Sequence, residues 1–93
     1  MSGPVVTRNV VVSNPTGLCL RGASSIARVA KGFQAAIEIV KGEHRVHATD
    51  VLQVLSLTAI AGTQLVLEAA GPDAEAAINA LAALFEANFD LAQ

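Results

Sequence analysis

Runs of β-branched residues alternate along this chain with segments whose apolar residues recur at helical spacing. The first pattern is typical of β-strands and the second of amphipathic helices. The predicted strands are 5–12, 35–40, 45–48 and 64–69. The predicted helices are 20–31, a short helix that begins at Thr49 or Asp50 and ends at Leu57, and a last helix after Asp73.

The order of these elements, β-α-β-β-α-β-α, predicts an α+β fold. We expect an open-faced two-layer sandwich, in which a four-stranded antiparallel sheet is covered on one face by three helices. Lys41-Gly42-Glu43-His44 is the expected hairpin turn. Gly32 is placed to end the first helix as a C′ glycine, and Asp73 can cap the last helix. That last helix is predicted to present an apolar stripe of Ile78, Leu81, Leu84, Phe85 and Phe89.

Length and composition limit both the core and the partners. The chain has 93 residues, enough for one modest core, so we expect a single domain, 1–93. It contains three Phe and neither Tyr nor Trp, so the core must be built from Ala, Val, Leu and Ile. Six basic and eight acidic residues give a net charge of −2, which provides no electrostatic basis for binding nucleic acid or an anionic membrane.

Cysteine usage and hydropathy indicate the compartment. A single cysteine cannot form an intramolecular disulfide, which fits a reducing environment. Met1–Pro4 lacks the basic and apolar regions of a signal peptide, and no apolar stretch approaches the roughly 20 residues of a membrane helix. We expect a cytoplasmic protein that does not insert into a membrane, and we also expect a monomer without a cofactor.

A thiol and a guanidinium lie two positions apart where a glycine-containing loop, Asn14–Gly17, enters the first predicted helix. Amides at a helix N-terminus are unpaired and the dipole there is positive, so Leu20, Arg21 and Gly22 are candidates to bind phosphate. The same field lowers the pKa of a thiol, which makes Cys19 a candidate nucleophile. Two plainer interpretations stay open, namely Cys19 as a small buried hydrophobic residue and Arg21 as a solvated surface charge.

Four short motifs follow one another along the chain. They are Gly17-Leu18-Cys19-Leu20-Arg21-Gly22-Ala23, Lys31-Gly32-Phe33, Leu55-Ser56-Leu57 and Ala61-Gly62-Thr63. In order and spacing they resemble HPr, the histidine-containing phosphocarrier of the bacterial sugar phosphotransferase system, over nearly the whole chain. In that family a loop of the form Gly-Leu-His-Ala/Thr-Arg-Pro-Ala opens the first helix. The resemblance implies the HPr fold, with Enzyme I and sugar-specific phosphotransferase components, or a regulatory protein, as partners.

The chain departs from the HPr pattern at the functional positions. The phosphorylated His of the family corresponds to Cys19 and the Pro after its Arg corresponds to Gly22, so that Arg21 alone of the three is kept. The Ser that a regulatory kinase phosphorylates in some bacteria corresponds to Asp50. The resemblance therefore implies that Asp50 acts as a permanent, weaker phosphoserine, whereas its plainer interpretation is a helix N-cap.

Three hypotheses on function follow. In the first, the chain is a phosphocarrier that accepts a phosphoryl group on Cys19, with Arg21 balancing the phosphate charge. In the second, it is a regulatory binding module without phosphotransfer. Its partner would then contact apolar residues of the first two helices, namely Leu20, Val51, Leu52 and Leu55. In the third, which ranks last, Cys19 is a redox-sensing thiol.

The two histidines do not replace the missing imidazole. His44 and His47 are far in sequence from Cys19, and their separation of three places them on opposite faces of a strand. We therefore expect surface histidines and no metal site.

Overall fold

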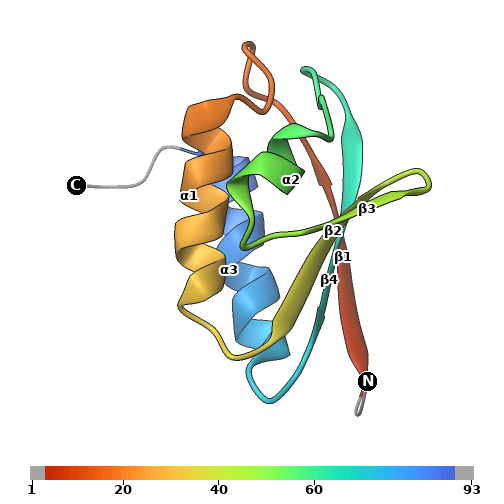
Figure 1. Cartoon of the computed structure of the whole chain (residues 1–93), viewed down its shortest axis with the longest axis vertical. Helices are drawn as coiled ribbons and strands as arrows, with labels where there is room; N and C mark the ends of the chain where they lie inside the picture. Colours follow the sequence, from red (N-terminus) through yellow and green to blue (C-terminus); the bar gives the residue numbers. More distant parts are fainter. Residues whose placement is uncertain (1–3, 90–93) are drawn as a thin grey trace.

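The computed structural model describes residues 4–89 of the chain. Within this range the predicted order β-α-β-β-α-β-α is confirmed. The elements are β1 (Val5–Val11), α1 (Leu20–Lys31), β2 (Ala36–Lys41), β3 (His44–His47), α2 (Val51–Leu55), β4 (Gln64–Ala70) and α3 (Ala74–Glu86). Figure 1 shows the three helices packed on one side of the sheet, with no described element on the other side. The expected open-faced sandwich is therefore confirmed.

The sheet has the strand order β1-β4-β2-β3, and each neighbouring pair is antiparallel. Because side chains alternate along a strand, every second residue faces the helices. These inward-facing positions hold buried aliphatic side chains, including Val10, Ile37, Ile39, Val46, Leu65 and Leu67. The core thus lies between the sheet and the helix layer and consists largely of Ala, Val, Leu and Ile, as the composition required.

The predicted apolar stripe of the last helix is confirmed for four of its five residues, whereas Phe89 lies outside the helix. Its members are all buried: Ile78, Leu81, Leu84, Phe85 and Phe89. The rings of Phe85 and Phe89 pack edge to face, with centroids 4.9 Å apart. Phe89 lies beyond the last residue of α3, Glu86, so it enters the core from the turn that follows the helix.

Two helix ends differ from the sequence prediction. α1 ends at Lys31 as predicted, but Gly32 has a right-handed backbone, with φ −77°, and so does not use the left-handed conformation expected of a C′ glycine. α2 ends at Leu55 and not at Leu57. Beyond α2 the chain tightens into a turn, in which the Leu57 amide donates to the Val54 carbonyl over 3.1 Å, and Thr58 is left-handed.

Asp73 has a different role from the one predicted. It occupies the N-cap position of α3, but its side chain makes no capping bond to that helix. Its carboxylate instead accepts hydrogen bonds from the backbone amides of Gln34 and Ala35, each over 2.8 Å. The side chain therefore holds the loop between α1 and β2 against the start of α3, two segments that are distant in sequence.

We expect Asp73→Ala to lower the free energy of unfolding by about 1–2 kcal/mol, because two amides lose a charged acceptor and one of them is partly buried. Urea denaturation measures this loss. Glu75→Ala is the matched control, since Glu75 is an exposed carboxylate in the same helical turn and should contribute only about 0.3–1 kcal/mol through the helix dipole. Equal losses for the two variants would contradict the assigned role of Asp73.

Candidate functional site

The loop before α1 is shaped by Asn14. Its Oδ1 accepts hydrogen bonds from both the amide and the hydroxyl of Thr16, over 3.1 and 3.0 Å, and its carbonyl accepts from the Gly17 amide over 2.8 Å. Such an Asx-type turn explains why Asn and Gly flank this segment. The Leu18 amide then donates to the carbonyl of Ala59 over 2.8 Å, which fixes the loop to the segment before β4.

Cys19 is the N-cap residue of α1. Its backbone is extended, with φ −96° and ψ −174°, and its carbonyl accepts the first intrahelical bond, from the Ala23 amide over 2.9 Å. Its thiol is exposed to solvent. The interpretation of Cys19 as a small buried hydrophobic residue is therefore wrong, because the loop ends in an orientation that turns the side chain outward while the neighbouring Leu18 is buried.

The surroundings of the sulfur favour the thiolate. The backbone amides of Gly22 and then Arg21 lower the pKa of the Cys19 thiol, and the Thr16 hydroxyl lowers this pKa further, while partial desolvation acts in the opposite direction. The amides contribute most because the N–H groups in the first turn of a helix point toward its N-terminal end, where the sulfur lies. Cys19 therefore ionises at a lower pH than an ordinary cysteine, and the thiolate is the nucleophilic form.

A surface hollow of about 360 Å³ adjoins this thiol. It is lined by Asn14, Thr16, Cys19, Arg21, Gly22, Asn88 and Phe89. The predicted residues Arg21 and Gly22 are thus brought together with Cys19, whereas Leu20 does not line the hollow. An anion bound there would meet the guanidinium of Arg21 and the positive N-terminal end of α1.

Sequence reasoning missed Thr16, Asn88 and Phe89. The Asn-Pro-Thr-Gly run carried a signal for Thr16, since an Asn side chain in an Asx turn bonds the backbone two residues on. The other two residues come from the far end of the chain, and nothing in their local sequence connects them with Cys19.

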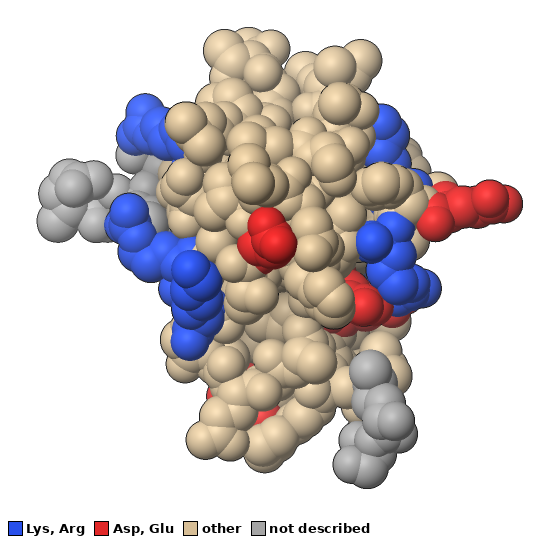
Figure 2. Space-filling model, in the orientation of Figure 1, with Lys and Arg blue, Asp and Glu red and all other residues tan. Residues whose placement is uncertain are grey.

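The predicted partner residues divide into two pairs. Leu20 and Leu52 are strongly exposed, at 62% and 78%, whereas Val51 and Leu55 are half-buried and pack against the core. Figure 2 shows Lys and Arg side chains on the α1 side of the molecule and also on the opposite side, and the basic residues of α1 are exposed. We call Leu20, Arg21 and Leu52 the α1–α2 surface, since these residues stand at the starts of two packed helices.

Asp50 caps α2. Its Oδ1 accepts from the amides of Leu52 and Gln53 over 3.0 and 3.2 Å, and its Oδ2 accepts from the Gln53 side-chain amide over 3.2 Å. The predicted capping role is confirmed. The regulatory role implied by the family resemblance stays a prediction.

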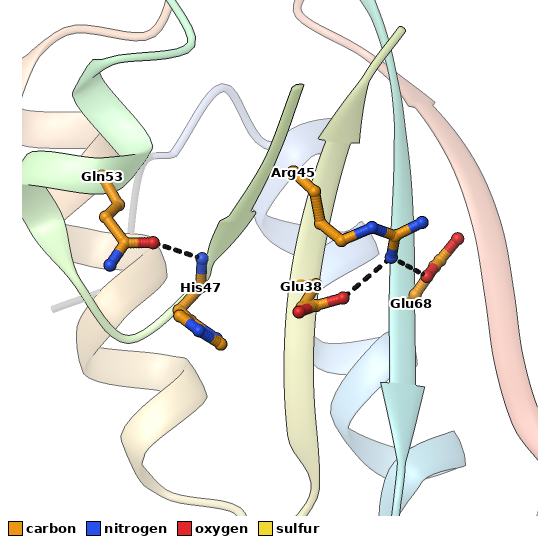
Figure 3. Close-up of polar contacts among 5 residues, drawn as sticks. All are labelled: Glu38, Arg45, His47, Gln53 and Glu68. Carbon is orange, nitrogen blue, oxygen red and sulfur yellow. Dashed lines mark hydrogen bonds and ion pairs between the residues drawn. The ribbon is translucent and has the colours of Figure 1, made fainter. Parts of the chain in front are cut away.

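The histidines lie on β3, away from the Cys19 loop. His44 shares a hydrogen bond of 3.1 Å with the Ser56 hydroxyl, and the His47 amide donates to the Gln53 side chain over 3.0 Å (Figure 3). Within residues 4–89 no group of three or more His, Cys, Asp or Glu side chains could hold a metal ion.

The open face of the sheet carries a small ion-pair cluster. Arg45 reaches from β3 across β2 and pairs with Glu38 on β2 and Glu68 on β4 (Figure 3). These two carboxylates are directly opposite each other in the sheet register, so the guanidinium offsets their repulsion. The cluster supports the sheet and lies outside the Cys19 hollow.

Comparison with known proteins identifies similar chains. Residues 6–87 match the family described as PTS HPr component phosphorylation site. The phosphocarrier protein NPr of Shewanella violacea is 41% identical over 83 residues, which cover 89% of this chain and 91% of that protein. The phosphoryl donor subunit DhaM of a PEP-dependent dihydroxyacetone kinase from Providencia stuartii is 38% identical over 95% of this chain, which spans 18% of DhaM.

A solved structure with the same fold is HPr from Bacillus anthracis. It superposes with a TM-score of 0.82 at 34% identity, over 87% of this chain and 96% of that one. Within the part of the present chain that the structure describes, no helix is long and apolar enough to cross a membrane.

Proposed function

The chain belongs to the HPr family, and from this premise we propose that it is a phosphocarrier whose acceptor atom is the sulfur of Cys19. The observation that carries this proposal is the exposed thiol at the N-cap of α1, with its pKa lowered by the Gly22 and Arg21 amides. In the family an imidazole nitrogen stands at this position. A thiolate supplies an equivalent nucleophile there, and the hollow beside it leaves room for the transferred group.

The transfer is a simple displacement. The Cys19 thiolate attacks the phosphorus of the donor, a sulfur–phosphorus bond forms, and the bond from phosphorus to the donor's leaving atom breaks. The leaving atom takes up a proton. Arg21 and the α1 amides then balance the charge on the phosphothiol. For onward transfer the thiolate is the leaving group, and the same low pKa favours its departure.

We propose that the α1–α2 surface meets the partners. Exposed apolar residues beside a guanidinium suit a partner whose apolar patch is bordered by acidic side chains. Phosphotransferase components such as Enzyme I and the sugar-specific proteins are the expected partners. We place the protein in the cytoplasm as a monomeric single domain, 1–93, because a reducing compartment keeps the thiol free.

A regulatory binding module is the second candidate. The strong exposure of Leu20 and Leu52 favours it, since a docking surface does not require a working acceptor. In that case Asp50, whose carboxylate is fixed at the start of α2, would mimic the phosphorylated Ser of the family.

We expect the protein to gain the mass of one phosphoryl group when it is incubated with phosphoenolpyruvate and Enzyme I at neutral pH, and Cys19→Ser to gain none. Intact-protein mass spectrometry measures the gain. Serine caps helices well, so the variant keeps the fold and loses only the thiolate. If the wild-type chain gains no mass while the same Enzyme I phosphorylates an ordinary HPr, the regulatory module is the better function. A gain of oxygen in place of phosphate would support the redox hypothesis.

A further inference from the structure

Two consecutive residues after α3 adopt a conformation that is costly for residues other than glycine. Asn88 and Phe89 are both left-handed, with φ of 55° and 64°. Asn tolerates this region, but a bulky residue such as Phe rarely adopts it. Such strain persists only where the surrounding structure enforces it, and it often marks a functional site.

The contacts of Phe89 show what enforces the turn. Its amide donates to the Leu84 carbonyl over 2.7 Å, the residue is only 2% exposed, and its ring packs on Phe85. The ring also lies on the first turn of α1. A Cβ built on Gly22 would stand 3.1 Å from Phe89 Cδ2 and 3.1 Å from Leu18 Cδ1. The ring therefore fills the space that a side chain at position 22 would need.

Asn88 holds the other side of the same loop. Its Oδ1 accepts a hydrogen bond from the Ser13 hydroxyl over 2.6 Å. Ser13 precedes Cys19 and Gly22 follows it, so the two left-handed residues contact the loop on both sides of the thiol. Both also line the hollow beside Cys19.

We propose that the Asn88–Phe89 turn is the positioning element for Cys19. Phe89 holds the first turn of α1 through Gly22, and Asn88 holds the incoming loop through Ser13, so that the sulfur stays against the backbone amides of that first turn. The assignment of the thiol as a phosphoryl acceptor rests on the proposed function, whereas the positioning itself does not. The position of the Phe89 ring also explains why residue 22 is glycine, because the ring leaves little space for a larger side chain there.

The test is a double-mutant cycle on the Ser13–Asn88 bond in the full chain. Asn88→Gly keeps the left-handed turn, which glycine adopts without steric strain, and removes the acceptor, and Ser13→Ala removes the donor. We expect each variant to slow alkylation of Cys19 by iodoacetamide at pH 7 by about threefold and to move the midpoint of its pH profile upward. Alkylation of the double variant should be no slower than that of either single variant, because all three lack the same bond.

Two further variants separate positioning from general stability. Ile78→Val removes one buried methyl group from α3 away from the loop, and should lower stability while it leaves the alkylation profile unchanged. Phe89→Leu keeps an apolar side chain and loses the ring, and should slow alkylation in the same direction as the cycle. An unchanged alkylation profile in the Ser13 and Asn88 variants, or additive effects in the double variant, would overturn the proposal. Phosphorylation is measured separately. If the protein accepts no phosphate but its variants show these shifts in the alkylation profile, the proposed function is wrong and the positioning role is kept.

Discussion

Gly17→Ala is expected to lower the free energy of unfolding by about 2–4 kcal/mol, more than other single substitutions in the Cys19 loop. Gly17 has φ +73°, and a Cβ built on it would lie 2.8 Å from the carbonyl oxygen of Ala59 and 3.1 Å from the Cα of Ile60. Both are backbone atoms and cannot rotate away. The same carbonyl accepts the hydrogen bond from the Leu18 amide, so relieving the clash also weakens the attachment of the loop.

Urea denaturation of the wild-type chain and of Gly17→Ala measures this loss of stability. Gly62→Ala is the matched control. Gly62 is also left-handed, with φ +91°, but a Cβ there meets nothing within 4 Å. That variant should lose only the conformational preference, about 1–2 kcal/mol. Similar losses for the two variants would show that the close approach of Gly17 to Ala59 has no energetic weight.

Periodicity was sufficient to predict most of the fold. The limits of α1 were predicted to the residue, and β1 and β4 within one residue at an end, because strands and helices repeat their buried positions with different periods. The candidate site was found in part for a similar reason. A glycine-containing loop followed by a helical pattern locates a helix N-terminus, so the sequence alone places Cys19 and Arg21 there.

Other features could not be predicted, because they depend on contacts between distant residues. Whether Asp73 caps its own helix or binds the amides of Gln34 and Ala35 depends on how the α1–β2 loop is placed. The left-handed Phe89 contradicts the preference of its residue type, so local propensity predicts the wrong conformation. The exposure of the Cys19 thiol was likewise undecided between two interpretations until its neighbours were placed.

Gly22→Pro is expected to slow alkylation of Cys19 at pH 7 by about three- to tenfold, since it removes a hydrogen-bond donor to a charged group. The Gly22 amide is the largest cause of the lowered pKa of this thiol, and proline has no N–H. With that amide gone, the pKa rises toward the ordinary value for cysteine, so the midpoint of the alkylation profile moves to higher pH. Less thiolate is then present at neutral pH.

Gly22→Ala is the control that isolates the amide. Both variants add a Cβ beside Phe89 Cδ2 and Leu18 Cδ1, which must shift by a few tenths of an ångström, but alanine keeps the N–H. The first intrahelical bond comes from Ala23, so the Gly22 amide has no carbonyl partner in α1 and proline at this position removes no intrahelical bond. An alkylation profile shifted equally in both variants would assign the effect to crowding of Phe89. A shift confined to the proline variant would mean that the Gly22 amide, which proline lacks, stabilises the thiolate. The two departures from the family pattern, Cys19 and Gly22, would then be connected through one hydrogen bond.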